Sequence, residues 1–280
     1  MIEYLTRKKK EGRFPVYQTT ERPDRAAQAI LEGRVVLLTD NSPEALIFPA
    51  TLNSLFQTAD DYYRNERIVT FLRLIRYVAA FLALALPGLY VAAATFHPQL
   101  LPGNLIRSMA EARSGVPFPT AAEVLLMELS FELLREAGLR MPGPAGNTIG
   151  IVGGLIVGQA AVSANLVSPI TVTVAALTAL GSFSIPNEEL SEVFRLWKYG
   201  ILLLGSCFGI LGVMLGCFLL LMLMAEQESY GIPWLYPYVG GNLNERADEK
   251  DSMFLAAARK RKRRPIFAKW GNRIRFRRKS

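Results

Sequence analysis

Residues 149–183 read IGIVGGLIVGQAAVSANLVSPITVTVAALTALGSF and contain no Asp, Glu, Lys or Arg. A helix needs about 20 apolar residues to cross the hydrocarbon core of a bilayer, so this stretch is long enough for nearly two crossings. Ser168 precedes Pro169 near its middle, and a residue before proline is biased away from the helical conformation. We therefore predict two membrane spans, at 149–166 and 169–183, with a tight turn between them.

Two other apolar tracts flank this stretch and predict one span each, at 77–96 and 197–224. The segment at 120–140, TAAEVLLMELSFELLREAGLR, is apolar on one side but carries several charged side chains. Because a charge at the bilayer centre costs about 2.5–3.5 kcal/mol, we expect an amphipathic helix that lies at the membrane surface or enters it shielded by other helices. The predicted fold is a mainly α-helical integral membrane protein with about four transmembrane helices plus one amphipathic helix.

Residues 1–66 are more polar and predict a small, partial α/β domain on the cytoplasmic side. Two runs rich in β-forming residues, at 34–39 and 45–48, predict strands on either side of an Asp-Asn-Ser-Pro turn. Two strands bury little surface by themselves, so we expect this domain to pack against another subunit or against something missing from this chain. The membrane domain then covers residues 67–240.

Residues 241–280 predict a basic, largely disordered cytoplasmic tail. Residues 225–280 carry fourteen Lys and Arg against six Asp and Glu. Positive charge beside apolar segments marks the cytoplasmic side, so we expect both termini there. The basic runs predict binding to anionic lipid, at about 1 kcal/mol per charge. Contact with an acidic protein is the alternative, and nothing beside the charge favours nucleic acid.

The sequence contains no recognisable catalytic constellation. It has no phosphate-binding glycine loop with a lysine, no Cys-x-x-Cys pair and a single histidine. The adjacent carboxylates Asp60 and Asp61 stand beside two tyrosines and predict a structural cap or tether. We therefore expect no enzymatic activity, no cofactor and no metal site.

Glycines recur at four-residue spacing in the predicted spans and indicate close helix packing. Such stripes let another backbone approach closely, either within one subunit or between identical subunits of a homo-oligomer. The helix-packing candidates are Gly146, Gly150, Gly154, Gly158, Gly205, Gly209, Gly212 and Gly216.

Polar side chains in and beside the spans are candidates for lining a water path, because each costs free energy in lipid unless it is hydrogen-bonded or hydrated. Glu128 and Glu132 lie one turn apart on the amphipathic helix. Around a ring of subunits they would form acidic girdles that attract cations, and a solvated helix face is the alternative. The pore or polar-lining candidates are Glu128, Glu132, Gln159, Ser163 and Asn165.

Several long motifs are spread over most of the chain. They are TTERPD at 19–24, EGRVVLLTDNSP at 32–43, DDYY at 60–63, PFPTAAEVLLMELSFELLREAGLRMP at 117–142, IGIVGGLIVGQAAVSANLVSP at 149–169, FSIPN at 183–187 and YGIPWLYP at 230–237. In these motifs the chain resembles the A-subunit family of bacterial spore germinant receptors, the GerA family. The stage V sporulation protein AF belongs to the same family and is the other relative to which these motifs point.

The resemblance implies a role in spore germination at the spore inner membrane, in an oligomeric nutrient-gated channel for monovalent cations. It implies two partners, a transporter-like B subunit and a lipoprotein C subunit. Members of the family carry a longer soluble domain before the TERPD motif, so we expect this chain to be a truncated, split or shortened member. A non-conducting membrane scaffold that recruits other germination proteins is the alternative function.

Overall fold

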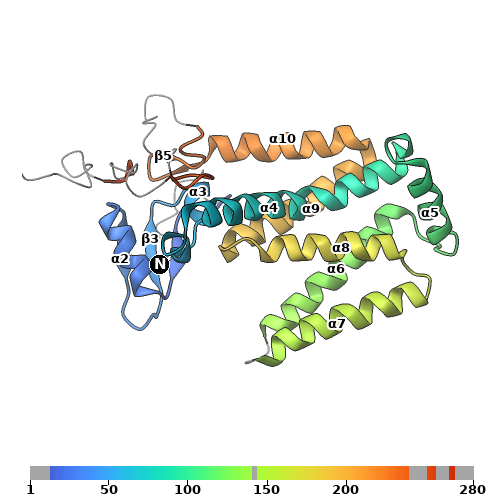
Figure 1. Ribbon diagram of the computed structural model, residues 1–280, viewed down its shortest axis with the longest axis horizontal. Coiled ribbons are helices and arrows are strands. Elements are labelled where there is room, and N and C mark those ends of the chain that lie inside the picture. The colour runs from blue at the N-terminus through green and yellow to red at the C-terminus, as the bar shows by residue number, and fades with distance from the viewer. Residues whose placement is uncertain (1–12, 141–143, 240–250, 257–264, 269–280) are drawn as a thin grey trace, which may run out of the picture. The chain divides into compact units, whose positions relative to one another are not determined.

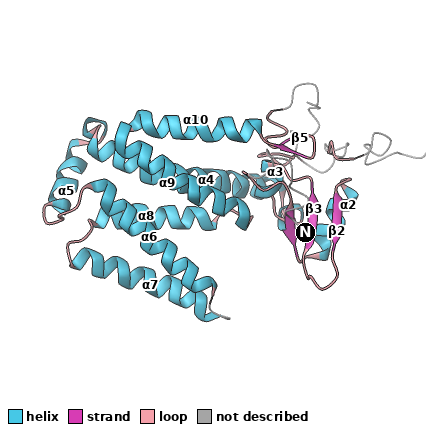
Figure 2. Ribbon diagram, turned by 180° about the vertical axis from the view of Figure 1, so that it is seen from behind, coloured by secondary structure: helices cyan, strands magenta, loops and turns pink. Residues whose placement is uncertain are grey.

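The computed structural model describes residues 13–140, 144–239, 251–256 and 265–268. The chain divides into two compact units (Figure 1). Unit 1 comprises Met1–Val78, Ile185–Val193 and Leu220–Ser280, and unit 2 comprises Ala79–Ser184 and Phe194–Leu219. The described part is mostly helical, which confirms the predicted main class, and it includes a small sheet (Figure 2).

Unit 1 is built around a three-stranded antiparallel sheet with strand order β1-β3-β2. Its N-terminal elements are β1 (Gln18–Thr20), α2 (Pro23–Leu31), β2 (Val35–Leu38), β3 (Ala45–Phe48), α3 (Leu52–Phe56) and the 3-10 helix η1 (Ala59–Tyr62). In the central strand, Leu46 lies opposite Thr19 on one side and Leu37 on the other. Every residue of β3 is buried, as its uninterrupted apolar run requires. The sequence predicted β2 and β3, whereas β1 was not anticipated.

Residues far along the chain complete the core of unit 1. A short hairpin, β4 (Glu228–Ser229) and β5 (Ile232–Pro233), leads to Trp234, whose side chain is fully buried. The Trp234 indole nitrogen donates to the carbonyl of Pro15 at 2.8 Å, and the Ser229 hydroxyl donates to the carbonyl of Val16 at 2.8 Å. The Trp234 ring also packs 5.0 Å from the ring of Phe14. The N-terminal sheet and the segment after the last helix therefore form one hydrophobic core.

Two described pieces of the C-terminal tail also belong to unit 1. We call residues 251–256 the clasp and residues 265–268 the tail anchor. In the clasp, the Leu255 amide donates to the Thr70 hydroxyl at 3.2 Å, and in the tail anchor Ala268 is buried. Gly33 has φ +89°, and a Cβ there would lie 2.5 Å from the Cα of Ala268. The rest of the predicted tail 241–280 lies outside the described residues.

Unit 2 is made mostly of helices. The helices from the first apolar tract onward are α4 (Glu66–Thr95), η2 (Pro98–Leu100), α5 (Gly103–Arg113), α6 (Thr120–Leu139), α7 (Pro144–Ser163), α8 (Pro169–Phe183), α9 (Glu188–Phe208) and α10 (Ile210–Glu226). Helix α6 packs against both α7 and α8, around a core of Met127, Ala161, Val167 and Ala175 (Figure 1). A second core joins Val91 of α4, Val124 of α6 and Leu202 of α9.

The structure has two helices where the sequence predicted a single span at 197–224, because the chain turns back on itself at Gly209. This glycine has φ +63°, a conformation that side-chain-bearing residues rarely adopt, and α9 ends just before it. A Cβ on Gly212 would lie 2.0 Å from the carbonyl oxygen of Leu204, and one on Gly216 would lie 2.9 Å from Ile201. Helices α9 and α10 therefore form a tightly packed hairpin in which glycine is sterically required.

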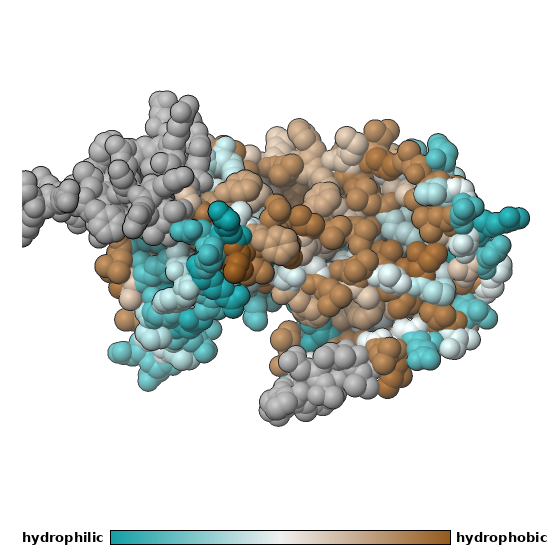
Figure 3. Space-filling view, in the orientation of Figure 1, coloured by the Kyte–Doolittle hydropathy of each residue, from teal (hydrophilic) through white to brown (hydrophobic). Residues whose placement is uncertain are grey.

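Hydrophobic residues gather over the helices of unit 2, whereas the α/β part of unit 1 is more hydrophilic (Figure 3). Among the described helices, only α4 combines the length and the apolar composition needed to cross a bilayer. The stretches Gly153–Ser163, Pro169–Phe183 and Ile210–Glu226 are apolar but shorter. The membrane location and the number of spans therefore stay predictions.

Candidate functional site

The most unusual feature of unit 2 is a buried ion pair between helices α6 and α9. The Lys198 ammonium lies 2.6 Å from Oε2 of Glu128, and the two residues are only 5% and 1% exposed. The second carboxylate oxygen, Oε1 of Glu128, is buried and has no hydrogen-bond partner among the described residues. Charged groups this deeply buried are retained in few places, because removal from water costs several kcal/mol per ion.

A second ion pair lies one turn further along the same two helices. Arg195 donates from Nη1 to Oε1 of Glu132, and the side chains are 17% and 33% exposed. Glu128 and Glu132 are four residues apart on α6, while Arg195 and Lys198 are three apart on α9, so each pair shares a helix face. We call these two ion pairs the charge ladder.

A third carboxylate of α6, Glu123, is fully buried and fully partnered. Its Oε1 accepts from Arg113 of α5 at 3.1 Å, and its Oε2 accepts from the Ser168 amide at 3.0 Å and the Thr171 hydroxyl at 3.1 Å. The Tyr90 hydroxyl of α4 lies 3.4 Å from that of Thr171. Glu123 therefore fixes the turn between α7 and α8 to the first turn of α6.

The remaining polar-lining candidates do not join this buried cluster. Gln159 and Ser163 on α7 and Asn165 after it are all exposed, whereas Glu128 is buried. Asn165 has φ +54° and lies in the turn, where a short polar side chain tolerates the left-handed conformation. The structure thus brings together the two predicted glutamates and leaves the other three residues at the surface of unit 2.

Several of the predicted glycines contact neighbouring helices within the chain. A Cβ on Gly154 would lie 3.2 Å from Phe131 of α6, and one on Gly158 would lie 3.1 Å from Val172 of α8. In α9, a Cβ on Gly205 would lie 3.0 Å from the carbonyl oxygen of Gly88. Gly146 and Gly150 lie in α7, and their surroundings are outside the described residues.

Sequence reasoning did not identify Arg195 and Lys198, the partners of the two glutamates. Basic residues at the start of an apolar run are commonly interfacial anchors, so their position alone does not indicate a buried ion pair. Their three-residue spacing, together with the four-residue Glu spacing on another helix, is the signal that could have indicated interhelical pairing.

Unit 1 contains its own buried charge network, at the start of α4. Asp61 and Arg73 are 2% and 1% exposed, and Oδ2 of Asp61 lies 3.2 Å from Nε of Arg73 and 2.9 Å from Nη1 of Arg76. Oδ1 of Asp251 in the clasp lies 3.0 Å from Nη1 of Arg73. Burial opposes ionisation of Asp61, but hydrogen bonds and charge from Arg76, the Thr58 amide and Arg73 outweigh it and hold its pKa below the usual value. Asp61 is thus a cap for η1 and a tether for α4.

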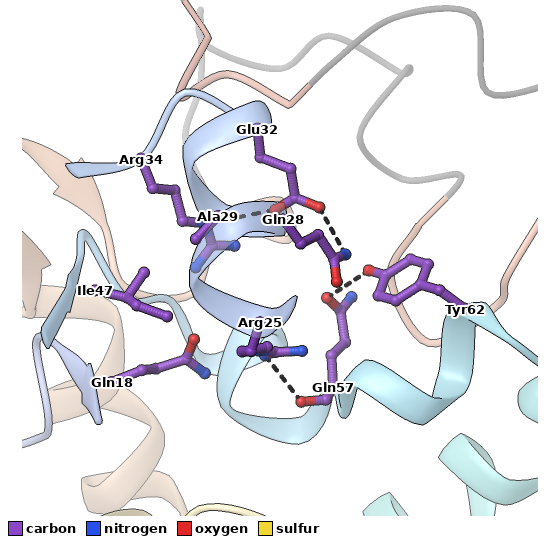
Figure 4. Close-up of a pocket in the computed structure, with 9 residues that line it drawn as sticks. All are labelled: Gln18, Arg25, Gln28, Ala29, Glu32, Arg34, Ile47, Gln57 and Tyr62. Atoms are coloured by element: carbon purple, nitrogen blue, oxygen red, sulfur yellow. Dashed lines mark hydrogen bonds and ion pairs between the residues drawn. The ribbon is translucent and has the colours of Figure 1, made fainter. Parts of the chain in front are cut away.

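A small polar pocket lies beside this network, between α2, the sheet and η1 (Figure 4). An Arg25 guanidinium nitrogen donates to the Gln57 carbonyl at 3.1 Å, and the Tyr62 hydroxyl donates to Oε1 of Gln57 at 3.1 Å. Burial raises the pKa of Tyr62, which keeps this hydroxyl protonated. The pocket has a volume of about 10 Å³, which is room for about one water molecule. We therefore assign it a structural rather than a ligand-binding role.

No cluster of three or more His, Cys, Asp or Glu with the geometry of a metal site occurs within the described ranges. The two cysteines, Cys207 and Cys217, are free thiols.

Comparison with known proteins places the chain in a family. The sequence profile described as "Bacillus/Clostridium GerA spore germination protein" matches residues 1–267. The chain belongs to the GerA family. This confirms the resemblance found in the motifs.

The relatives are proteins of Bacillus. The chain is 43% identical to "Uncharacterized membrane protein YfkQ" of Bacillus subtilis (strain 168), over 87% of this chain and 47% of that protein. It is 41% identical to "Spore germination protein GerLA" of Bacillus cereus, over 84% of this chain and 48% of that protein. It is also 41% identical to "Spore germination protein A1" of Bacillus subtilis (strain 168), over 84% and 49%. The chain thus spans about half the length of these relatives, and no solved structure matches it.

Proposed function

We propose that this chain is a membrane subunit of a spore germinant receptor complex, and that copies of it assemble into a nutrient-gated channel for monovalent cations. Membership of the GerA family supports the role in germination. The channel role rests on one observation, the charge ladder enclosed by the apolar helices of unit 2. Ionisable groups inside a membrane bundle are costly, and they usually mark the path of an ion.

The surface of unit 2 favours a membrane location. Large apolar side chains are open to the outside on several helices, among them Leu180 at 62%, Leu211 at 73% and Phe218 at 65%. Exposed apolar surface of this extent is expected where lipid or another subunit covers it. We propose the bacterial cell membrane or the spore inner membrane, with both termini cytoplasmic and the basic tail on anionic lipid. The proposed partners are a transporter-like B subunit and a lipoprotein C subunit, and we propose no enzymatic role.

One observation favours a second candidate function, a non-conducting scaffold that recruits or stabilises other germination proteins. Glu128 and Glu132 are both neutralised by basic side chains of the same chain. A neutralised carboxylate attracts cations less strongly than a free one. Pull-down with tail-deleted protein separates the two functions, since a scaffold loses its partners while a channel still conducts.

A cation-flux assay in liposomes tests the channel role. The wild type is compared with Gly154→Leu, whose side chain would meet Phe131, and with Glu128→Gln, which removes one buried charge. We expect flux from the wild type and altered flux from both variants. Equal flux from all three proteins, or none from any, would count against a pore role for these residues.

A further inference from the structure

We propose that the charge ladder is a latch that holds α6 against α9 in the resting subunit, and that activation opens it. This inference rests on the proposed function and specifies how that function is regulated. When the latch is closed, Lys198 and Arg195 neutralise Glu128 and Glu132. When α6 leaves α9, both carboxylates lose their counter-charges and face the water path as free anions. The two glutamates therefore first hold α6 against α9 in the closed latch, and they attract cations once the latch has opened.

The arrangement of the ladder favours one concerted opening. Both ion pairs join α6 to α9. Both glutamates lie on one face of α6, one turn apart, so a single movement of that face separates both pairs. The Tyr199 hydroxyl, 3.5 Å from the Glu128 carbonyl, adds a contact to the same interface.

The inner ion pair, between Glu128 and Lys198, leaves one buried carboxylate oxygen without a hydrogen bond in the part of the chain that the structure describes, which is unfavourable for a purely structural contact. Oε1 of Glu128 is buried without a hydrogen bond among the described residues. The Thr178 hydroxyl of α8 lies close to the Glu128 carboxylate and favours its ionised form, but the hydrogen bond that it donates at 2.9 Å goes to the Val174 carbonyl. A buried polar atom with no partner loses the hydration it would have in water. Opening would return this oxygen to water, so part of the cost of breaking the ion pair is recovered.

Glu123 on the same helix differs from Glu128 because it makes a complete set of hydrogen bonds, as expected for a contact that does not open. Both of its oxygens are partnered, and its four donors come from Arg113, Ser168 and Thr171. Helix α6 is thus fixed near its N-terminus by a complete set of hydrogen bonds. Further along, it is held to α9 by the two ion pairs of the ladder. The described geometry therefore places a firm anchor at Glu123 and a releasable contact at the ladder.

The decisive variant replaces the inner ion pair with apolar side chains, as Glu128→Leu together with Lys198→Met. Replacing both partners of a buried pair is often neutral or stabilising, whereas removing one partner leaves an uncompensated charge. We expect the double variant to fold and to melt in detergent at least as high as wild type, but to conduct at least tenfold less because α6 cannot leave α9. The control is Glu136→Gln, which removes an exposed ion pair with Arg140 on the same helix. It should conduct like wild type.

A second readout reports opening without relying on conductance. Leu202 is 2% exposed and packs against Val124 of α6, so a cysteine at this position reacts with a thiol reagent only when α6 and α9 separate. The background has Cys207 and Cys217 replaced by serine. We expect Glu128→Gln to speed labelling of Leu202→Cys at least tenfold, and the apolar double variant to slow it below the wild-type rate.

The two readouts keep the latch distinct from the proposed channel. If wild type conducts and the stable apolar variant conducts equally, the pair is structural and the latch is overturned. Labelling rates that are the same in all variants also overturn it. If wild type does not conduct while labelling follows the expected order, the latch stands as a conformational contact and the channel function fails.

Discussion

Replacing Asp61 by Asn tests how the start of α4 is held in unit 1. The substitution keeps the size of the side chain and removes the charge that faces Arg73 and Arg76. Breaking a buried ion pair costs about 3–5 kcal/mol, and Arg73 keeps its second partner, Asp251, at 3.0 Å. We therefore expect the loss to fall at the low end, about 3 kcal/mol. The neighbouring Asp60→Asn is the matched control.

The control changes the neighbouring aspartate, which is exposed and pairs with one arginine instead of two. The Asp60 side chain is 58% exposed and pairs with an equally exposed Arg22 at 3.2 Å. Exposed pairs contribute about 0–1 kcal/mol. With a urea dependence of about 1–3 kcal/mol per molar for a small unit, Asp61→Asn should lower the unfolding midpoint by about 1–3 M, and Asp60→Asn by a few tenths.

Urea unfolding of the detergent-solubilised chain, followed by the fluorescence of buried Trp234, measures both shifts. Replacing Trp197 and Trp270 by Phe makes the signal specific to unit 1. Because the pKa of Asp61 is lowered in the folded state, its contribution is present above the ordinary aspartate value and is lost as pH falls through the lowered value. The acid-induced loss should be smaller in Asp61→Asn. Equal shifts for the two variants would refute the tether.

Three further predictions use the same measurements. Gly33→Ala and Gly231→Ala both force alanine into a left-handed conformation, which costs about 1–2 kcal/mol. Only at Gly33 would the added Cβ also meet the backbone of the tail anchor, at 2.5 Å, so the urea midpoint of Gly33→Ala should fall further than that of Gly231→Ala. In the hairpin, the new methyl group of Gly212→Ala would lie 2.0 Å from a carbonyl oxygen, so we expect a loss of about 1–3 kcal/mol of stability, measured as a lower melting temperature in detergent. Gly200→Ala places its methyl group in open space and should be neutral or stabilising by up to about 1 kcal/mol. Burial raises the pKa of Glu189 in the folded state, so the stability of unit 1 should decline as the pH rises through this raised pKa. Glu189→Gln, which cannot ionise, should show a smaller decline over the same pH range.

Local sequence patterns predicted the elements whose arrangement of apolar and charged residues matches their surroundings in the fold. The run ALIF at 45–48 became a fully buried strand, and the helix expected at 120–140 is α6, Thr120–Leu139. In both, the local pattern and the tertiary environment agree, so no distant residue had to be known.

The turn at Gly209 shows where local patterns fail. Gly205, Gly209, Gly212 and Gly216 are all compatible with one long helix, and composition does not reveal which glycine adopts a positive φ. Only the contact of α10 with α9 decides it. The partners of Glu128 and Glu132 were missed for a similar reason, because they lie 70 and 63 residues away along the chain and the pairing depends on how two helices cross.

The large sequence separation between contacting residues of unit 1 determines when this unit can fold during synthesis. Its core needs Pro15 and Trp234, 219 residues apart, and its charge network needs Arg73 and Asp251, 178 residues apart. Closing such long loops is slow compared with forming local helices. Residues up to Asp251 must therefore leave the ribosome before the N-terminal sheet and the start of α4 gain these partners. Until then the nascent sheet stays exposed to proteases and chaperones.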